Sequence, residues 1–289
     1  MANGILVIDK PEGWTSHDVV AKLRGIFHER RIGHAGTLDP MATGVLPVFV
    51  GRATRAVEFA SDREKTYLAG LRLGTVTDTQ DVTGSVLENH PVSVGREELE
   101  RILDRYRGDI LQVPPMYSAV KKNGRKLYEL ARRGEEIERA PRPISIYSLE
   151  VVEQVSETDY ILRVQCSKGT YVRTLCHDIG QTLGCGGTLY LLRRTQAAGF
   201  ALSDAVTMQR VVEAEEPGAL LLPVDAYFSS FPALLLKDLT SEKRVRNGSQ
   251  LALFGQDGTY RVYGPGGDFL ALSRLEHGQL TTIKSFFEV

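Results

Sequence analysis

The stretch GHAGTLDPMATGVLP, residues 33–47, places a single acid, Asp39, among glycine, proline, threonine, histidine and apolar residues. Gly33 and Gly36 permit turns that a Cβ atom would hinder, and Pro40 restricts Asp39 to extended backbone geometry. The apolar run VLPVFV then carries the chain into a core. This pattern predicts a loop that holds the Asp39 carboxylate at the rim of the core. The alternative is common: an aspartate in such a loop often only accepts hydrogen bonds from its own turn.

A reactive carboxylate in this setting needs a cationic partner, because an isolated acid against apolar walls tends to stay protonated. In SKGTYVRTL, residues 167–175, Arg173 falls at the start of a predicted helix whose other inward positions are apolar. A guanidinium there is costly without an anion. We therefore expect Arg173 to pair with Asp39, against the alternative of a surface arginine in a first helical turn.

Strand and helix patterns are mixed without strict alternation. Strands are predicted over 4–9, 66–74, 144–155 and 160–167, and helices after a cap at Thr15 or Ser16, near 96–107, in a short basic segment ending at Gly134, and near 172–183. Residues 78–84 read as a polar loop. This order favours an α+β fold with a mixed sheet flanked by helices.

The pattern changes near residues 228–232, where short strands separated by glycine-containing turns begin. We expect two domains: residues 1–230, and a small β-rich domain over residues 231–289.

Composition and motif searches limit the function. The 289 residues are 42% hydrophobic, no window approaches a membrane span, and no signal-peptide pattern opens the chain, so we expect a cytoplasmic protein. The three cysteines match no metal, redox or disulfide pattern and are expected to be reduced. No motif for ATP, a serine nucleophile, zinc or NAD occurs, so we expect neither a metal nor a cofactor.

The net charge of −1 hides a basic segment. Residues 121–142 contain eight basic and four acidic side chains, and smaller basic groups lie at 30–31, at Arg193-Arg194 and at 243–246. Each cluster alone is usually a solvated face. Together they favour a surface that follows nucleic-acid phosphates.

Six segments carry a more specific signal. In order, they are DKPEGWTSHD (9–18), the stretch at 33–47, KTYLAGLRLGTVTDTQDVTG (65–84), VPPMYSAVKKNGRKLYELAR (113–132), SKGTYVRTLCHDIG (167–180) and LGCGGTLYLLRRTQAAGF (183–200). They resemble the TruB family of bacterial tRNA pseudouridine(55) synthases over most of residues 4–200. The last 60 or so residues resemble, more weakly, the PUA-type RNA-binding domain.

The resemblance implies a cofactor-free isomerase, an intramolecular transferase with a pseudouridine-synthase-like mixed sheet and a PUA-like C-terminal domain. Such an enzyme flips uridine 55 out of the T-loop of tRNA, detaches the base and rejoins it to the sugar through C5. The implied partner is tRNA, through its T-arm and, as a further expectation, its acceptor stem. We expect a monomer with no obligate protein partner and no membrane association.

The resemblance also implies roles for particular residues. Asp39 matches the catalytic aspartate, and attack on C1′, attack on C6 and deprotonation of the sugar all remain open for it. Arg173 matches its partner, and Tyr67 matches the tyrosine that stacks on the base and is assigned proton transfer at C5. The remaining substrate-binding positions are His34, Tyr171, Leu192 and Lys10. Contacts to the tRNA backbone are expected from Lys121, Lys122, Arg125, Lys126, Arg132 and Arg133.

Two other functions remain open at this point. One is an RNA-binding tRNA-folding helper in which catalysis is secondary, and the presence of Asp39, Tyr67 and Arg173 together argues against it. The other is a carboxylate hydrolase, which would need a second acid near Asp39. The sequence around Asp39 shows no such acid.

Overall fold

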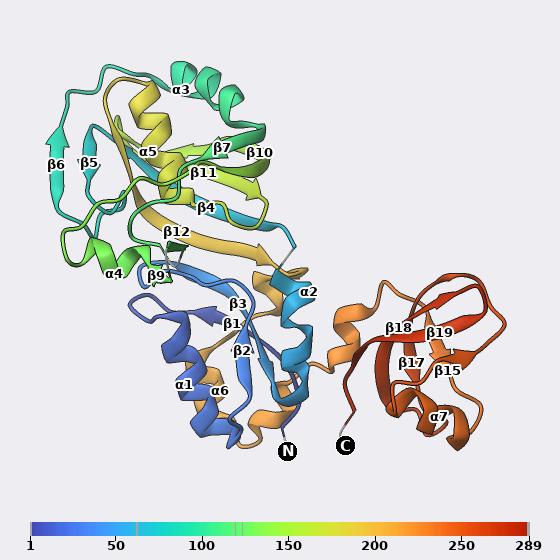
Figure 1. The fold of residues 1–289 in the computed structure, drawn as a ribbon. Helices are drawn as coiled ribbons and strands as arrows, with labels where there is room; N and C mark the ends of the chain where they lie inside the picture. The colour runs from blue at the N-terminus through green and yellow to red at the C-terminus, as the bar shows by residue number, and fades with distance from the viewer. Residues whose placement is uncertain (1, 62, 119, 123, 288–289) are drawn as a thin grey trace.

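A ten-stranded mixed sheet forms most of the molecule, and a separate five-stranded sheet lies at its C-terminal end (Figure 1). The computed structural model describes residues 2–61, 63–118, 120–122 and 124–287. The large sheet contains β1 (Gly4–Lys10), β2 (Ile32–His34), β3 (Thr43–Val50), β4 (Lys65–Leu73), β7 (Gly108–Gln112), β10 (Arg142–Gln154), β11 (Asp159–Cys166), β12 (Gly187–Ala197), β13 (Phe200–Ala201) and β14 (Val206–Thr207). Its order is β14-β1-β3-β12-β4-β11-β10-β7, with β13 beside β12 and β2 beside β3. The predicted α+β class is confirmed.

Strand β12 joins the two halves of this sheet (Figure 1). It runs parallel to β3 and antiparallel to β4, so Arg194 lies opposite Gly44 on one side and Tyr67 on the other. Gly44 has φ +101°, and a Cβ atom there would come within 2.1 Å of the Arg194 carbonyl oxygen. Only glycine allows this close approach, which brings the Asp39 loop, just before β3, next to Tyr67.

Helices lie against both sheets. They are α1 (Ser16–Phe27), α2 (Val57–Ser61), α3 (Arg96–Leu103), α4 (Leu127–Ala131), α5 (Val172–Thr182), α6 (Met208–Glu213) and α7 (Leu239–Arg246). Apolar residues of α3 and α5 share a core with β4, β10, β11 and β12, whereas α1 and α6 pack on β1 and β3. Short 3-10 turns cover Gly51–Ala56, Asp104–Tyr106, Leu202–Asp204, Pro217–Leu220 and Val224–Phe228.

The first helix shows how local sequence fixes an element near the site. Thr15 is its N-cap: the Thr15 hydroxyl accepts from the backbone N–H of Asp18, and the Asp18 carboxylate accepts from the N–H of Thr15. This capping box satisfies two of the free N–H groups at the helix start. Val19, Val20 and Leu23 form the buried face of α1 against the sheet, and Phe27 packs beside them, partly buried.

Two small hairpins project from the large sheet. One pairs β5 (Thr75–Thr77) with β6 (Val86–Asn89), and the other pairs β8 (Lys121–Lys122) with β9 (Arg125–Lys126). The second hairpin precedes α4. The prediction that the basic helix runs to Gly134 is wrong, because α4 ends at Ala131 and the chain reaches Gly134, with φ +72°, through turns.

The C-terminal sheet contains β15 (Ala233–Leu235), β16 (Leu251–Ala252), β17 (Gly258–Tyr263), β18 (Phe269–Glu276) and β19 (Gln279–Ser285), and α7 packs against it. Phe286 nevertheless packs with Phe228 and Phe49 in a cluster that belongs to both sheets. The rings of Phe228 and Phe286 lie 5.5 Å apart. The division between residues 230 and 231 stays a prediction. Within the described ranges, no helix combines the length and apolar character needed to cross a bilayer.

Candidate active site

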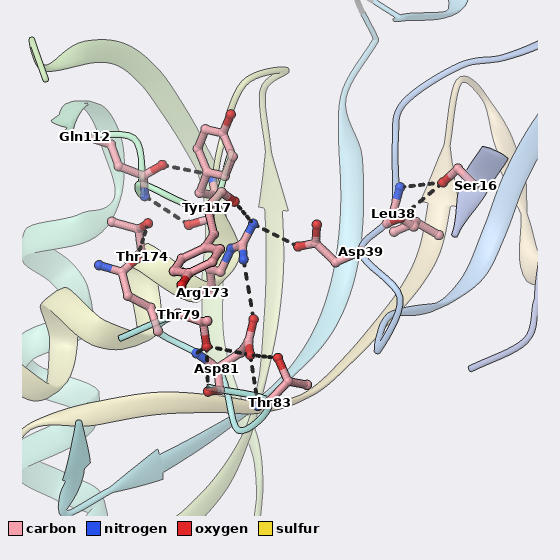
Figure 2. Close-up of polar contacts among 12 residues, drawn as sticks. Ser16, Leu38, Asp39, Thr79, Asp81, Thr83, Gln112, Tyr117, Arg173 and Thr174 are labelled. Atoms are coloured by element: carbon pink, nitrogen blue, oxygen red, sulfur yellow. Dashed lines mark hydrogen bonds and ion pairs between the residues drawn. The ribbon is translucent and has the colours of Figure 1, made fainter. Parts of the chain in front are cut away.

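The loop that carries Asp39 is fixed from two directions. On one side, the Ser16 hydroxyl at the start of α1 accepts from the backbone N–H of Leu38 at 2.9 Å and donates to the Leu38 carbonyl at 3.1 Å (Figure 2). On the other side, the N–H of Ala42 donates to the carbonyl of Asp39 at 3.0 Å. The Asp39 side chain itself is 41% exposed. The loop therefore holds this carboxylate at a fixed place with one side open.

Lys10 is a buried residue that contacts the backbone of the same loop. Its side chain is fully buried, and Nζ donates to the carbonyls of Pro11 at 2.8 Å, Trp14 at 2.6 Å and Pro40 at 3.2 Å. Burial lowers the pKa of Lys10 to about 8, an effect that the nearby Asp39 charge partly opposes. The expectation that Lys10 binds substrate directly is corrected here: its three donors serve the backbone.

Arg173, in the first turn of α5, lies against the Asp39 carboxylate. Arg173 Nη2 is 3.1 Å from Asp39 Oδ2, and the same nitrogen donates to the Tyr117 carbonyl at 2.7 Å (Figure 2). Arg173 is 7% exposed, so this charge is largely removed from water. The ion pair predicted from the sequence is thereby confirmed.

A second acid, Asp81, contacts Arg173 from the opposite side and was missed. Asp81 Oδ2 lies 3.4 Å from Arg173 Nη1 (Figure 2). Its other oxygen accepts from the Thr79 hydroxyl at 2.9 Å, the Thr83 N–H at 3.0 Å and the Thr83 hydroxyl at 2.5 Å. The sequence shows no second acid beside Asp39, but the fold brings Asp81 to the same guanidinium that Asp39 contacts. The sequence TDTQDVTG shows the threonines that flank Asp81 on both sides but carries no signal for its pairing with Arg173.

Tyr67 on β4 lies beside a buried arginine. The Tyr67 side chain is buried, which raises the pKa of its phenol, while the positive charge of Arg194 acts in the opposite direction. Arg194 is fully buried, with Nε donating to the Val45 carbonyl at 2.7 Å and Nη2 to the Gly36 carbonyl at 2.9 Å. The prediction that Arg194 belongs to a basic surface cluster is therefore wrong: β12 carries this side chain beneath the loop that contains Gly36 and Asp39.

The other predicted binding residues surround the same region. Leu192 is buried in the core formed with β4 and α5. Tyr171 is the half-buried N-cap residue of α5, and the buried Gln112 amide both accepts from its N–H at 2.8 Å and donates to its carbonyl at 3.1 Å. His34, at the end of β2, is partly buried; burial lowers its pKa, and its Nδ1 has no hydrogen-bond partner among the described residues.

The basic segment forms the β8–β9 hairpin and helix α4. Lys121, Arg125, Arg132 and Arg133 are exposed. Lys126 is half-buried, with its ammonium 3.2 Å from the Tyr128 hydroxyl, and the Arg132 guanidinium lies over the same ring at 5.4 Å. The side chain of Lys122 lies outside the described residues. The segment thus presents several cations to solvent around one tyrosine.

The described residues contain no group of three His, Cys, Asp or Glu side chains arranged to hold a metal ion. The three cysteines, Cys166, Cys176 and Cys185, are buried and unpaired, as expected from their spacing. Burial raises the pKa of Cys166 to about 11 and that of Cys176 to about 12, so neither thiol ionises readily.

Comparison with known protein families gives a consistent match. Residues 24–172 match the model of the TruB family pseudouridylate synthase N-terminal domain, and residues 173–229 match the tRNA pseudouridylate synthase B C-terminal domain. Among curated proteins, tRNA pseudouridine synthase B of Clostridium kluyveri is 43% identical over 98% of this chain and 99% of its own length. The enzyme of the same name from Ralstonia pickettii is 46% identical over 91% of this chain and 85% of its own.

Solved structures match over nearly the whole chain. A chain in a Cbf5-Nop10-Gar1 complex superposes with a TM-score of 0.72 at 27% identity, covering 98% of this chain and 85% of that one. A chain in an H/ACA RNP bound to a substrate RNA containing 2′-deoxyuridine gives the same TM-score of 0.72 at 25% identity, covering 99% of this chain and 85% of that one.

Proposed function

This chain belongs to the TruB family of pseudouridylate synthases, and from that premise we propose that it isomerises uridine 55 in the T-loop of tRNA to pseudouridine, with Asp39 as the reacting carboxylate. The reaction breaks the bond between C1′ and N1 of the base and forms a bond between C1′ and C5. One proton leaves C5 and one is gained at N1, so nothing is oxidised, reduced or hydrolysed. Such an isomerisation requires no external reactant.

The ion pair between Asp39 and Arg173 is the observation that carries this proposal. A reacting aspartate must be ionised and close to the substrate. The buried guanidinium of Arg173 supplies a fixed positive charge, while the exposed side of Asp39 stays open to an incoming nucleotide. An electrostatic partner held in place in this way costs no reorganisation when charge develops during the reaction.

A uridine in a folded T-loop reaches Asp39 only if it leaves its stack. Flipping costs a few kcal/mol, which an aromatic and apolar receiving surface offsets. We assign that surface to Tyr67, Tyr171 and Leu192, which the fold places on β4, at the start of α5 and on β12. Because burial raises its pKa, Tyr67 is a neutral phenol at pH 7, which suits stacking on a neutral base. His34 ends β2, directly before the connection that carries Asp39, and is assigned to the T-loop around the flipped base.

The exposed cations of the β8–β9 hairpin and of the turn that follows α4 are assigned to the tRNA backbone. Lysine and arginine contacts to phosphates are independent of sequence and fix the position of the substrate. In this assignment the T-arm binds across the basic segment, and the C-terminal sheet reaches toward the acceptor stem. We propose that the protein acts on tRNA in the cytoplasm as a monomer.

The second acid does not favour a hydrolase. In an acid and base pair, one carboxylate must activate a water. The Asp81 side chain is 4% exposed, and its oxygens are occupied by Arg173, Thr79 and Thr83. Asp81 therefore acts on Arg173 and has no place for a reacting water.

Mapping pseudouridine in an unmodified tRNA transcript, after incubation with the purified protein and no added cofactor, tests the proposed function. Pseudouridine at position 55 alone is the expected result. Binding of the transcript without conversion would contradict the proposal and favour the RNA-binding helper. Cleavage of the transcript or release of uracil would favour a hydrolase.

A further inference from the structure

Gln80, the residue before Asp81, has an unusual backbone conformation. Its φ is +65°, in the left-handed region that glycine and asparagine adopt far more readily than a long side chain such as glutamine. Gln80 lies in the loop between β5 and β6, and the residue after it is the buried acid that contacts Arg173. A costly conformation next to a functional carboxylate persists only if other contacts hold it.

Three contacts hold Gln80 in this conformation. Its N–H donates to the Thr77 carbonyl at 3.2 Å, and its carbonyl accepts from the Leu189 N–H of β12 at 3.0 Å. Its side-chain Oε1 accepts from the Thr174 hydroxyl of α5 at 2.7 Å. The first two are backbone bonds that many residues could make, whereas the third depends on the glutamine side chain.

The third contact duplicates the link between Asp81 and Arg173. Thr174 directly follows Arg173 in α5, and Gln80 directly precedes Asp81 in the loop. Two adjacent pairs thus connect the same two segments, one through an ion pair of 3.4 Å and one through a hydrogen bond of 2.7 Å. Thr174 is 3% exposed, so its hydroxyl depends on this protein partner rather than on water.

We propose that Gln80 is a positioning residue for the isomerisation. Its hydrogen bond to Thr174 fixes the position of Asp81 and thereby keeps the Arg173 guanidinium directed toward Asp39. Arg173 is shared between two carboxylates, at 3.1 Å from Asp39 and 3.4 Å from Asp81. If the φ angle of Gln80 relaxes to a negative value, Asp81 moves with the loop. The Arg173 guanidinium then shifts toward whichever of the two carboxylates lies closer. The proposal rests on the proposed function, because it concerns the aim of the charge that supports Asp39.

Variants at residue 80 separate the side-chain bond from the backbone conformation. Gln80→Gly keeps the left-handed backbone and deletes the amide, and Thr174→Val removes the same bond from the other side. Gln80→Glu retains an acceptor for the Thr174 hydroxyl and serves as the conservative rescue. Val82→Ala, on the other side of Asp81 and 43% exposed, is the matched control in the same loop.

The experiment measures the single-turnover rate of pseudouridine formation, the affinity for a T-arm minihelix and the thermal midpoint of each variant. We expect Gln80→Gly and Thr174→Val each to slow the reaction roughly ten- to hundredfold, because small displacements of a catalytic group cost that much. Affinity should stay within about threefold, and the double variant should be no slower than the slower single variant. Gln80→Glu and Val82→Ala should react within about threefold of the wild-type protein.

A second readout does not depend on turnover. The Nε–H resonance of Arg173 in nitrogen-15 NMR should shift in Gln80→Gly and Thr174→Val and stay in place in Gln80→Glu and Val82→Ala. An unshifted resonance in the first two variants, or a wild-type reaction rate in Gln80→Gly, overturns the proposal. A wild-type protein that forms no pseudouridine refutes the proposed function instead, and the resonance then still decides whether Gln80 positions Arg173.

Discussion

The Asp39 carboxylate and the Arg173 guanidinium meet at 3.1 Å, although one lies in a loop before β3 and the other in the first turn of α5. Arg173 also contacts Asp81 and the Tyr117 carbonyl, so three separate segments converge on it. A buried cation with two anionic neighbours keeps its charge without water. The more exposed of those anions, Asp39, is the one available to a substrate.

Removing the guanidinium should destabilise the fold. Arg173→Met leaves Asp81 buried without its cation, and breaking a buried pair in this way costs about 3–5 kcal/mol. Urea unfolding measures the loss. Adding Asp81→Asn to Arg173→Met should restore part of it, because the remaining charge is then gone. Arg163→Met, which breaks an exposed pair with Glu150, is the control and should cost under about 1 kcal/mol. Equal losses for Arg163→Met and Arg173→Met would refute this account of Arg173.

Asp81 should influence the rate without touching the substrate. Asp81→Asn keeps an oxygen that accepts from the Thr83 N–H. It removes the negative charge that contacts Arg173 on the side opposite Asp39. We expect pseudouridine formation to slow roughly ten- to hundredfold, while the affinity for a T-arm minihelix stays unchanged. Single-turnover kinetics at saturating enzyme give the rate. A variant that loses affinity but keeps its rate would show that Asp81 belongs to the RNA-binding surface.

The cations of the β8–β9 hairpin should contribute to the salt dependence of tRNA binding. Each phosphate contact contributes about 0.7–0.9 to the slope of log affinity against log salt. The double change of Lys121→Gln and Arg125→Gln, two exposed residues, should therefore lower that slope by about 1.5 and leave the saturated rate nearly unchanged. The control makes the same charge change at Arg101 and Arg105, on and just after α3. An unaltered slope in the hairpin variant excludes the assignment.

The sequence predicts the parts of the site that local chemistry determines. Asp39 is a lone acid in a loop of glycine and proline, and Arg173 lies at the start of an apolar helix. A charge in either place is costly unless an opposite charge lies beside it, and for this reason the ion pair could be predicted. The helix cap at Thr15 is likewise a local pattern.

Asp81 and Arg194 could not be predicted in this way, because both depend on tertiary pairing. In the sequence, Asp81 looks like an ordinary loop acid. Its position is fixed only in the fold, where β12 binds the residues on either side of it; for example, the N–H of Val82 donates to the Leu189 carbonyl at 2.9 Å. Arg194 reads as one half of a basic pair. It is buried because β12 lies between β3 and β4, where Gly44 allows the close approach. The local sequence pattern does not distinguish the buried Arg194 from its neighbour Arg193, which pairs with Asp9 at 2.8 Å.

Lys10 should give the fold an alkaline dependence. Its pKa is lowered from 10.5 to about 8 in the folded protein. Between these values the unfolded chain binds the proton that the folded protein has released, so the free energy of unfolding rises with pH. Relative to Lys10→Met, which cannot titrate, the wild-type protein should gain on the order of 3 kcal/mol across this window. Urea unfolding at several pH values checks this, and parallel curves for the two proteins would contradict it.

The rate of pseudouridine formation by Asp39→Asn, measured in single turnover on a T-arm minihelix whose affinity is determined in parallel, tests the central role of this carboxylate most directly. The asparagine retains the shape of the side chain and loses its charge and nucleophilicity. We predict no detectable pseudouridine, with affinity within about tenfold of the wild-type protein. Pseudouridine formed at a rate near that of the wild-type protein would contradict the account.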